Sequence, residues 1–392
     1  MTTWYQDSGG TSAIWARAYA PASGGWQGYG TIEPALYPAY TPDVAINPNG
    51  TGMIVWQQSD GSTNRIYGMP YQTGVAGTYG SKDLVSTTAT AAEAPSVAIN
   101  ANGTGVVTWV QSDGTHYETW ACIFDQTHGW GTPTQLEASS GEESITPSAA
   151  IDDAGNAIVV WQRAANLSTG PYTVWASRFM GNAWAANPTQ LHASSGDEGN
   201  PSVAMGPTGA IATWTETLDA GNSYQIHVSR WTAGSDAWTA PTRVSPTTEM
   251  ADMPSVAMDA QGNALLVWQQ SFGGLSVTHA SIAASQFTPA SGWSGVRRLD
   301  SINSNVGIPA LAMNAAGSAN IVWQQLDGSV YSIVGLRYAP AGGWGVPTLL
   351  ESSQAGSAYA PKVCVGANGQ AMATWYQKDA NGLRSVFTNR FR

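Results

Sequence analysis

The stretch at residues 254–270, PSVAMDAQGNALLVWQQ, sets the spacing of the chain, because near-copies of it recur along the sequence. Other copies read PDVAINPNGTGMIVWQQ at 42–58 and PSAAIDDAGNAIVVWQR at 147–163. The Trp near the end of each copy falls at Trp4, Trp56, Trp109, Trp161, Trp214, Trp268, Trp323 and Trp375. A repeat of roughly 50 residues is typical of propellers and related arrays.

Each repeat divides into four strand-like pieces separated by turn residues. Strand A follows a Pro and ends in an [Asn/Asp/Gly]-x-x-Gly turn, whose Gly can adopt a positive φ at low cost. Strand B is a nearly continuous apolar run, as expected of a strand covered on both faces. Strand C alternates and carries an aromatic column, and strand D is short. The column is expected at Trp15, Tyr67, Trp120, Trp175, His227, Tyr331 and Phe387. The pattern predicts an all-β fold of four-stranded antiparallel blades, a β-propeller.

The motif P-x-V-A-x-[Asn/Asp/Gly]-x-x-Gly at the head of strand A resembles NHL-type propeller repeats, and more loosely those of TolB-like propellers. The resemblance implies that strand A lines a central channel, where crowding would explain its small side chains. This chain departs from the NHL pattern after strand B, where it carries Trp followed by Gln instead of an acidic residue.

We expect a single domain over residues 1–392, with eight blades favoured and seven possible. The sequence supplies eight B and C strands but seven A and D strands, so eight blades would leave three strands in the first and last. The termini would then lie side by side, because closing the ring protects the sheet edges. The expected repeats are 1–41, 42–94, 95–146, 147–200, 201–253, 254–308, 309–360 and 361–392.

Composition limits the partners and the location of the protein. The net charge of −11, without any basic run, disfavours nucleic acid and anionic membrane surfaces. No apolar run reaches the ~20 residues that span a bilayer. Few charges, almost no Lys and much Gly, Ser, Thr and Trp favour an extracellular bacterial protein, although the chain shows no leader. Cys122 and Cys364 are expected to be buried free thiols.

Two repeated features are candidates for ligand binding, because an aromatic ring stacks on a sugar while amides bond its hydroxyls. The first is a Trp between strands C and D, at Trp26, Trp130, Trp184, Trp238, Trp293 and Trp344. The second is the Gln two residues after the strand-B Trp, at Gln58, Gln111, Gln270 and Gln325. The alternative is structural, with the Trp rings wedged between blades and the amides bonded to loop backbone.

An acidic set lies in the loops that join strand D to the next strand A. Its members are Glu93, Glu142, Glu143, Asp197, Glu198, Glu249 and Asp252. Clustered carboxylates could bind calcium or supply an acid/base pair for glycoside hydrolysis. The alternative is a solvated acidic rim. No other cofactor is predicted.

The sequence carries no recognisable catalytic motif, and no catalytic residue is predicted. The five histidines have no metal-ligand spacing. Of these, His227 occupies the aromatic column of strand C, and His192 stands where a sister repeat has Glu137. His227 is interpreted as a packing residue.

The favoured hypothesis is a non-enzymatic binding protein that recognises glycans or acts as an adhesin. One alternative is a protein-interaction scaffold that uses the loops at 164–171 and 218–223. Another is a polysaccharide hydrolase or lyase, with acid and base among Glu142, Glu143, Asp197 and Glu198.

Overall fold

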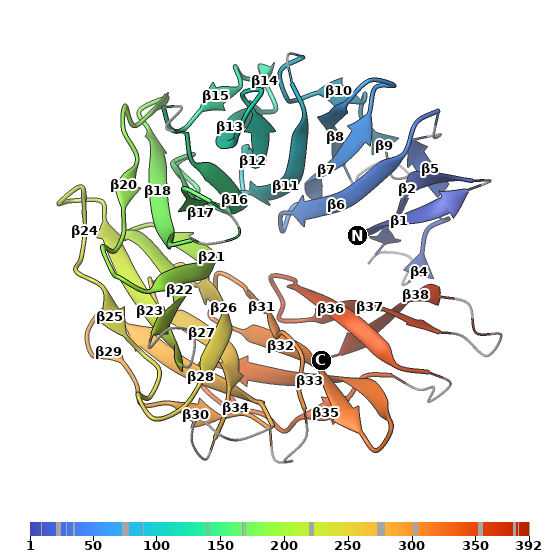
Figure 1. Ribbon diagram of the computed structural model, residues 1–392. Helices are drawn as coiled ribbons and strands as arrows, with labels where there is room; N and C mark the ends of the chain where they lie inside the picture. The colour runs from blue at the N-terminus through green and yellow to red at the C-terminus, as the bar shows by residue number, and fades with distance from the viewer. Residues whose placement is uncertain are drawn as a thin grey trace. The chain divides into compact units, whose positions relative to one another are not determined.

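The described residues of the computed structural model form β-strands joined by turns and loops, without any helix. The fold is therefore all-β, and its blades are those of an eight-bladed β-propeller, which confirms the fold class and the favoured blade count (Figure 1). The described residues are 1–8, 10–20, 25–28, 30–33, 36–72, 78–88, 90–138, 141–166, 168, 170–218, 223–272, 279–300, 305–351, 356–378, 382 and 384–391. Parts of the expected interaction loops at 164–171 and 218–223 lie outside them.

The chain divides into two compact units, Met1–Gln190 and Leu191–Arg392. The first unit holds blades 1 to 4. Its strands are β1 (Thr2–Ser8), β2 (Thr11–Arg17), β3 (Tyr19–Ala20), β4 (Gly25–Trp26) and β5 (Gly30–Glu33) in blade 1; β6 (Ala39–Ile46), β7 (Thr51–Ser59), β8 (Asn64–Gln72), β9 (Thr78–Tyr79) and β10 (Asp83–Leu84) in blade 2; β11 (Ala92–Ile99), β12 (Gly105–Ser112), β13 (Tyr117–Asp125), β14 (Gly129–Trp130) and β15 (Thr134–Gln135) in blade 3; and β16 (Glu143–Ile151), β17 (Ala157–Ala164), β18 (Tyr172–Met180), β19 (Ala183–Trp184) and β20 (Thr189–Gln190) in blade 4.

The second unit holds blades 5 to 8. Its strands are β21 (Asp197–Gly206), β22 (Gly209–Leu218), β23 (Ser223–Thr232), β24 (Ala237–Trp238) and β25 (Thr242–Arg243) in blade 5; β26 (Ala251–Met258), β27 (Ala264–Gln270), β28 (Ser281–Thr288), β29 (Gly292–Trp293) and β30 (Arg297–Arg298) in blade 6; β31 (Ala310–Met313), β32 (Ala319–Asp327), β33 (Val330–Ala339), β34 (Gly343–Trp344) and β35 (Thr348–Leu349) in blade 7; and β36 (Ala358–Val365), β37 (Ala371–Lys378) and β38 (Arg384–Phe391) in blade 8.

Each full blade is an antiparallel sheet in the order A, B, C, with strand D split into two short segments that both pair with strand C. Blade 8 has three strands, and the main sheet of blade 1 also has three, with β3 and β4 paired beside it, as the strand count predicted. That all eight blades form one domain stays a prediction. Within each unit, the A strands of successive blades lie against one another, as in the pairs β6 and β11 or β26 and β31.

The cores lie between neighbouring blades, and the strand-B Trp residues occupy them. Six of these Trp side chains are fully buried, namely Trp56, Trp109, Trp161, Trp214, Trp268 and Trp323. In one core, Trp109 of blade 3 packs with Met53, Val55 and Ile66 of blade 2. The apolar runs of strand B are therefore scaffold, which leaves the strand ends and loops for contacts with partners.

In six blades the A strand begins earlier than the sequence indicated. It starts before the Pro and carries a register shift there, between Glu93 and Ser96 in blade 3, for example. The A strand of blade 7, β31, starts after its Pro, at Ala310. The residue before the Pro has a positive φ in six blades, although none of these residues is Gly. They are Thr41, Ala94, Thr146, Asn200, Met253 and Ala360. A bulge at the Pro follows, because Pro cannot donate a ladder hydrogen bond.

Two further expectations are wrong. In the aromatic column, Val334 rather than Tyr331 lies opposite Trp323, because Tyr331 pairs with Leu326. The Cys122 thiol is buried, but Cys364 is exposed. Among the sister Ala residues of Cys364, Ala150 and Ala204 are buried, but Ala45 and Ala312 are only half-buried, so the burial of this slot in strand A differs between blades.

Candidate functional site

The Gln residues that follow the strand-B Trp are buried and bonded to the protein itself. The side-chain oxygens of Gln58, Gln111 and Gln325 each accept a hydrogen bond of 3.1 Å from the indole Nε1 of their strand-B Trp, and the oxygen of Gln270 accepts one of 2.6 Å. The amide nitrogen of Gln58 donates to the carbonyl of Tyr37 at 3.3 Å, in the loop before strand A. These contacts match the structural alternative. A ligand role for the four Gln side chains stays a prediction, and it would require these hydrogen bonds to break.

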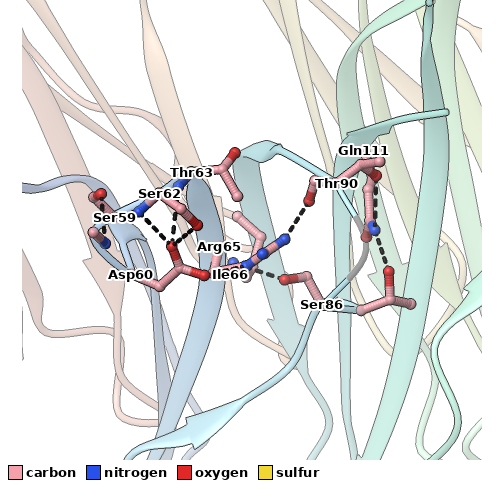
Figure 2. A network of polar contacts seen from close by, with 11 residues as sticks. Ser59, Asp60, Ser62, Thr63, Arg65, Ile66, Ser86, Thr90 and Gln111 are labelled. Atoms are coloured by element: carbon pink, nitrogen blue, oxygen red, sulfur yellow. Dashed lines mark hydrogen bonds and ion pairs between the residues drawn. The ribbon is translucent and has the colours of Figure 1, made fainter. Parts of the chain in front are cut away.

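Figure 2 shows how such a Gln is tied into the strand ends of blades 2 and 3. The Gln111 amide donates to the hydroxyls of Thr87 and Thr90. The Thr90 carbonyl accepts a hydrogen bond of 2.6 Å from Arg65, whose Nε lies 2.8 Å from Asp60. Hydrogen bonds from the hydroxyl of Ser62 and from backbone N–H groups of the turn hold the pKa of Asp60 well below its usual range. All the hydrogen bonds of this network join groups of the protein itself.

Blade 4 breaks the Gln pattern with Arg163. There the Trp161 indole donates instead to Glu137, at 3.2 Å, and the backbone N–H of Thr119 donates to the same carboxylate at 2.8 Å. Arg163 Nε lies 2.5 Å from Glu142 and 3.6 Å from Glu137. The acidic residue Glu142 is therefore engaged in a local ion pair.

Blade 5 breaks the pattern with Glu216, and here two histidines join it. His227 Nδ1 lies 3.0 Å from Glu216 Oε2. His192 Nδ1 lies 2.8 Å from Glu198 Oε1 and 3.8 Å from Glu216 Oε2. The two imidazole rings are 5.6 Å apart, and that of His227 stacks on Trp214 at 6.2 Å. We call His192, Glu198, Glu216 and His227 the blade-5 cluster.

The backbone places the blade-5 cluster by register. Glu198 and Glu216 are directly opposed on β21 and β22, and His227 lies opposite Trp214 on β22 and β23. Both carboxylates are buried, while the side chains of His192 and His227 remain 25% and 12% exposed.

The electrostatics of the blade-5 cluster favour charged Glu216 and neutral His192. Burial alone would raise the pKa of Glu216, but hydrogen bonds from His227 and Ser194 outweigh it and lower that pKa. Burial lowers the pKa of His192 despite the nearby Glu216 carboxylate. Because each Nδ1 faces a carboxylate, Nε2 is the nitrogen left to exchange a proton with a ligand. Perturbed, buried ionisable groups of this kind are typical of functional sites.

The rest of the acidic set is dispersed. Glu93 accepts from Asn64 and Tyr117, and Glu143 accepts from the Tyr117 backbone. Asp252 accepts from Asn200 and Thr215, at 3.0 and 2.7 Å. Glu249 accepts from Gln270 at 3.1 Å, and Asp197 is exposed. Among the described residues, no three His, Cys, Asp or Glu side chains come together to hold a metal ion. Nor does that part of the chain contain a helix that could cross a membrane.

The Trp residues between strands C and D are half-buried and braced from behind. Trp130 packs on Phe124 with ring centroids 5.0 Å apart, and Trp344 packs on Tyr338 at 4.9 Å. Trp130 also packs on Gly68 of the neighbouring blade. The contact is so close that a Cβ at position 68 would lie 2.3 Å from the indole ring. Similar ring pairs hold Trp26, Trp184 and Trp293, whereas Trp238 lies opposite Trp231 in its sheet. Their buried faces pack the blades, and ligand binding by their exposed edges stays a prediction.

Blade 2 carries Tyr79 at the position where blade 3 has Trp130, and a groove opens beside it. The pairing of Tyr71 with Tyr79 matches that of Phe124 with Trp130. The groove has a volume of about 250 Å³ and lies between blades 2 and 3, lined by the aromatic rings Tyr71, Tyr79 and Phe124 and by polar side chains that include Thr51, Gln72 and Gln126. We call it the Tyr79 groove.

The polar edge of the Tyr79 groove is accessible. Gln72 and Gln126 are both exposed, and Gln126 Nε2 lies 3.3 Å from the hydroxyl of Thr51. Tyr79 is 37% exposed and packs on the buried Tyr71 with ring centroids 5.3 Å apart. Burial raises the pKa of both tyrosines, so their hydroxyls stay protonated and neutral.

Comparison with solved structures finds similar folds, all at low sequence identity. No protein-family model matches the sequence, and no curated protein matches it. An ulvan lyase of a new polysaccharide lyase family, solved with a -[GlcA(1-4)Rha3S]- saccharide bound, is similar with a TM-score of 0.58 and 9% identity over 88% of this chain and 90% of that one. The lectin of Aleuria aurantia, solved with Fucα1-6GlcNAc, shows a weaker likeness, with a TM-score of 0.44 and 12% identity over 79% of this chain and 94% of that one. No family match supports the NHL or TolB resemblance.

Sequence reasoning did not find the blade-5 cluster or the Tyr79 groove. A signal existed for the first, because Glu216 and His227 replace a Gln and an aromatic residue in the same repeat. The signal for the second is Tyr79, which replaces Trp. Both signals are substitutions within the repeat, whereas the candidates were chosen for their recurrence.

Proposed function

We propose that this protein binds saccharides and that the Tyr79 groove is a contact site for them. The observation that carries the proposal is the combination of a braced, partly exposed aromatic ring with two exposed amide side chains around one cavity. An aromatic face covers the apolar face of a sugar ring, and amides can both donate to and accept from its hydroxyls. Binding sites for small ligands typically combine aromatic rings with a small number of polar groups that point to the same place.

The fold is compatible with this proposal. The ulvan lyase with a similar fold was solved with a saccharide bound. Because the identity is 9%, that likeness supports the architecture and not a shared ligand. The half-exposed Trp residues between strands C and D would add weaker contacts, which repeat from blade to blade and so favour avidity. An extracellular or cell-surface location, expected from the composition, belongs to the same proposal.

The test is a titration of the full chain with soluble neutral and acidic polysaccharides. Binding is monitored by isothermal titration calorimetry and by tryptophan fluorescence. We expect saturable binding to at least one of them. Heat and fluorescence changes that never saturate with any polysaccharide would contradict the proposal.

A second candidate function is polysaccharide cleavage, and the blade-5 cluster favours it. Most sister blades fill the position of Glu216 with a neutral Gln, and blade 4 with Arg163, whereas blade 5 buries two carboxylates and places an imidazole against each. A His whose Nδ1 is held by a carboxylate is a general base or acid through Nε2. Of the acid/base candidates chosen from sequence, Glu198 alone belongs to this cluster.

This candidate is tested by incubating the protein with the same polysaccharides and measuring new reducing ends and ultraviolet absorbance from unsaturated ends. If the protein is an enzyme, His227→Gln and Glu216→Gln should each lower turnover at least a hundredfold. His116→Gln, in the 112–116 turn, is the control. Turnover that survives both cluster substitutions would exclude the cluster as the catalytic site.

A further inference from the structure

The groove beside Tyr79 is uncharged, and this property limits the saccharides it can accept. Among the described residues that line it, none is Asp, Glu, Lys, Arg or His. A uronate or sulfate group placed there would lose water without gaining a cation, which is unfavourable.

The acidic side chain nearest in sequence does not change this conclusion. Asp125 precedes Gln126, but its carboxylate accepts the backbone N–H groups of Thr127 and His128, at 2.8 and 2.7 Å. Its Oδ2 also lies 2.9 Å from His128 Nδ1. The Asp125 carboxylate is therefore occupied by hydrogen bonds within its own turn. The net charge of −11 on the whole chain adds a general repulsion of polyanions.

The hydrogen-bonding groups at the edge of the groove suit adjacent hydroxyls. Gln72 and Gln126 each offer a donor and an acceptor, and Thr51 offers a hydroxyl that already lies 3.3 Å from the Gln126 amide. Neutral tyrosine hydroxyls at Tyr71 and Tyr79 can donate and accept as well. All of these groups can bind the hydroxyls of an uncharged saccharide, and neither the groove nor the saccharide then has to desolvate a charge.

The size of the groove limits the ligand to a short segment. Its volume of about 250 Å³ lies below the roughly 300–1,000 Å³ of pockets that enclose drug-sized ligands. One or two sugar rings fill such a space. Tyr79 is already oriented by its 5.3 Å contact with buried Tyr71, so little ordering cost arises on binding.

We infer that the Tyr79 groove binds one or two residues of a neutral, unsubstituted pyranose chain, with the apolar face of a ring stacked on Tyr79 and its hydroxyls bonded by Gln72 and Gln126. This inference rests on the proposed function and adds the class of saccharide. It differs from the acidic, sulfated saccharide bound in the lyase of similar fold.

The test measures the affinity of the full chain for neutral hexasaccharides of glucose, mannose and galactose, and for oligogalacturonate of the same length. Calorimetry and a thermal melt are run on wild type, Tyr79→Ala, Tyr79→Phe, Gln126→Ala and Tyr376→Ala. The control residue Tyr376 is also 37% exposed and also packs on another tyrosine, Tyr359.

We expect at least one neutral chain to bind and oligogalacturonate to bind at least tenfold more weakly. Tyr79→Ala should weaken binding about tenfold or more, Gln126→Ala severalfold, and Tyr79→Phe and Tyr376→Ala less than twofold. If no saccharide binds wild type, the proposed function fails and the inference fails with it. If a saccharide binds but Tyr79→Ala has no effect, the groove is not the contact site and this inference is overturned, while saccharide binding by the protein stands. If Tyr79→Ala weakens binding but neutral chains are not preferred, only the class of saccharide inferred here is overturned. Tyr79→Phe keeps the ring, so it separates stacking from the hydrogen bonds of the hydroxyl, and the thermal melt shows whether Tyr79→Ala still folds.

Discussion

The position two residues after the strand-B Trp shows how one side chain distinguishes scaffold from candidate chemistry. In blades 2, 3, 6 and 7 a buried Gln there accepts the indole hydrogen bond. In blade 5, Glu216 turns to His227 and Ser194 instead, and the Trp214 indole finds no partner among the described residues. A buried carboxylate is costly unless it is compensated. In blade 5 the hydrogen bonds from His227 and Ser194 supply that compensation and lower the pKa of Glu216.

Glu216→Gln should lower the stability by about 1 kcal/mol or less, because the amide can accept from Trp214 but loses the charge that the hydrogen bonds from His227 and Ser194 favour. The reverse change, Gln270→Glu, should lower stability by about 1–3 kcal/mol, since it brings a second carboxylate to Glu249, which now accepts from Gln270 at 3.1 Å. Urea unfolding of both variants measures the difference. If Glu216→Gln proves the more destabilising of the two, the assignment of blade 5 as an electrostatic exception is wrong.

The same residues predict a dependence of stability on pH. The pKa of His192 in the folded protein lies below its usual value of 6.5, so the unfolded chain takes up this proton first, and stability is lost as the pH falls below about 6.5. The pKa of Glu216 also lies below its usual value of 4.5, and its contribution is present above that pH and is lost as the pH falls through the folded pKa.

Thermal melting between pH 7 and pH 5 should therefore show a falling Tm, and His192→Gln should reduce the fall over this interval. A slope that is identical in wild type and His192→Gln would show that this imidazole does not titrate differently on unfolding. His116→Gln is a suitable control here too.

At the scale of elements, the turn between strands A and B links one blade to the next. Asn100 is buried, and its Nδ2 donates to the carbonyl of Asp152 in the following blade at 2.8 Å. Its Oδ1 accepts the backbone N–H groups of Asn102 and Thr104 within the turn. Asn47 and Asn314 make the same kind of link. The sequence indicated a tight turn here, but not its second role, because the partner lies one repeat away.

Asn100→Asp should cost about 1–3 kcal/mol, because the acceptor within the turn remains while the donor to the next blade is replaced by a buried carboxylate. Asn49→Asp is the matched control, since Asn49 also donates across blades, to Ala101 at 2.9 Å, but is exposed. Urea unfolding should show a much smaller loss for this control. Equal losses would argue against a specific link through Asn100.

The bulge before each strand-A Pro predicts an unusual response to Gly. Ala94 is exposed and has φ of 52°, a conformation that costs a residue other than Gly roughly 1–2 kcal/mol. Ala94→Gly should therefore be neutral or stabilising. Ala92→Gly, two residues earlier in the same strand and buried, should cost about 1 kcal/mol or more. If both changes destabilise equally in urea, the bulge does not hold Ala94 in that conformation.

At the scale of the whole molecule, the repeat is what made the fold predictable. The recurring strand-B Trp gave the blade count, and the unequal numbers of strands correctly predicted three-stranded sheets in blades 1 and 8. The bulges were missed because a Pro reads as the start of a strand. Tyr331 was misplaced because periodicity alone does not fix the register of a strand that follows a turn of a different length.

The candidate sites were less predictable for the same reason. Residues that recur in most blades, such as Gln58 and Gln111, are those that these blades need for their own hydrogen bonds. The blade-5 cluster and the Tyr79 groove depend on contacts between side chains from different strands, and in the groove from different blades. Departures from the repeat identify such places better than the repeat does.

The central claim is that the Tyr79 groove binds a neutral saccharide. Its most direct test is to soak crystals of the full chain with the neutral hexasaccharide that the protein binds most tightly and to determine the structure. Our account predicts density for a sugar ring stacked on Tyr79, with hydroxyls within hydrogen-bonding distance of Gln72 or Gln126. Density at the histidines of the blade-5 cluster, with the Tyr79 groove unoccupied, would contradict it.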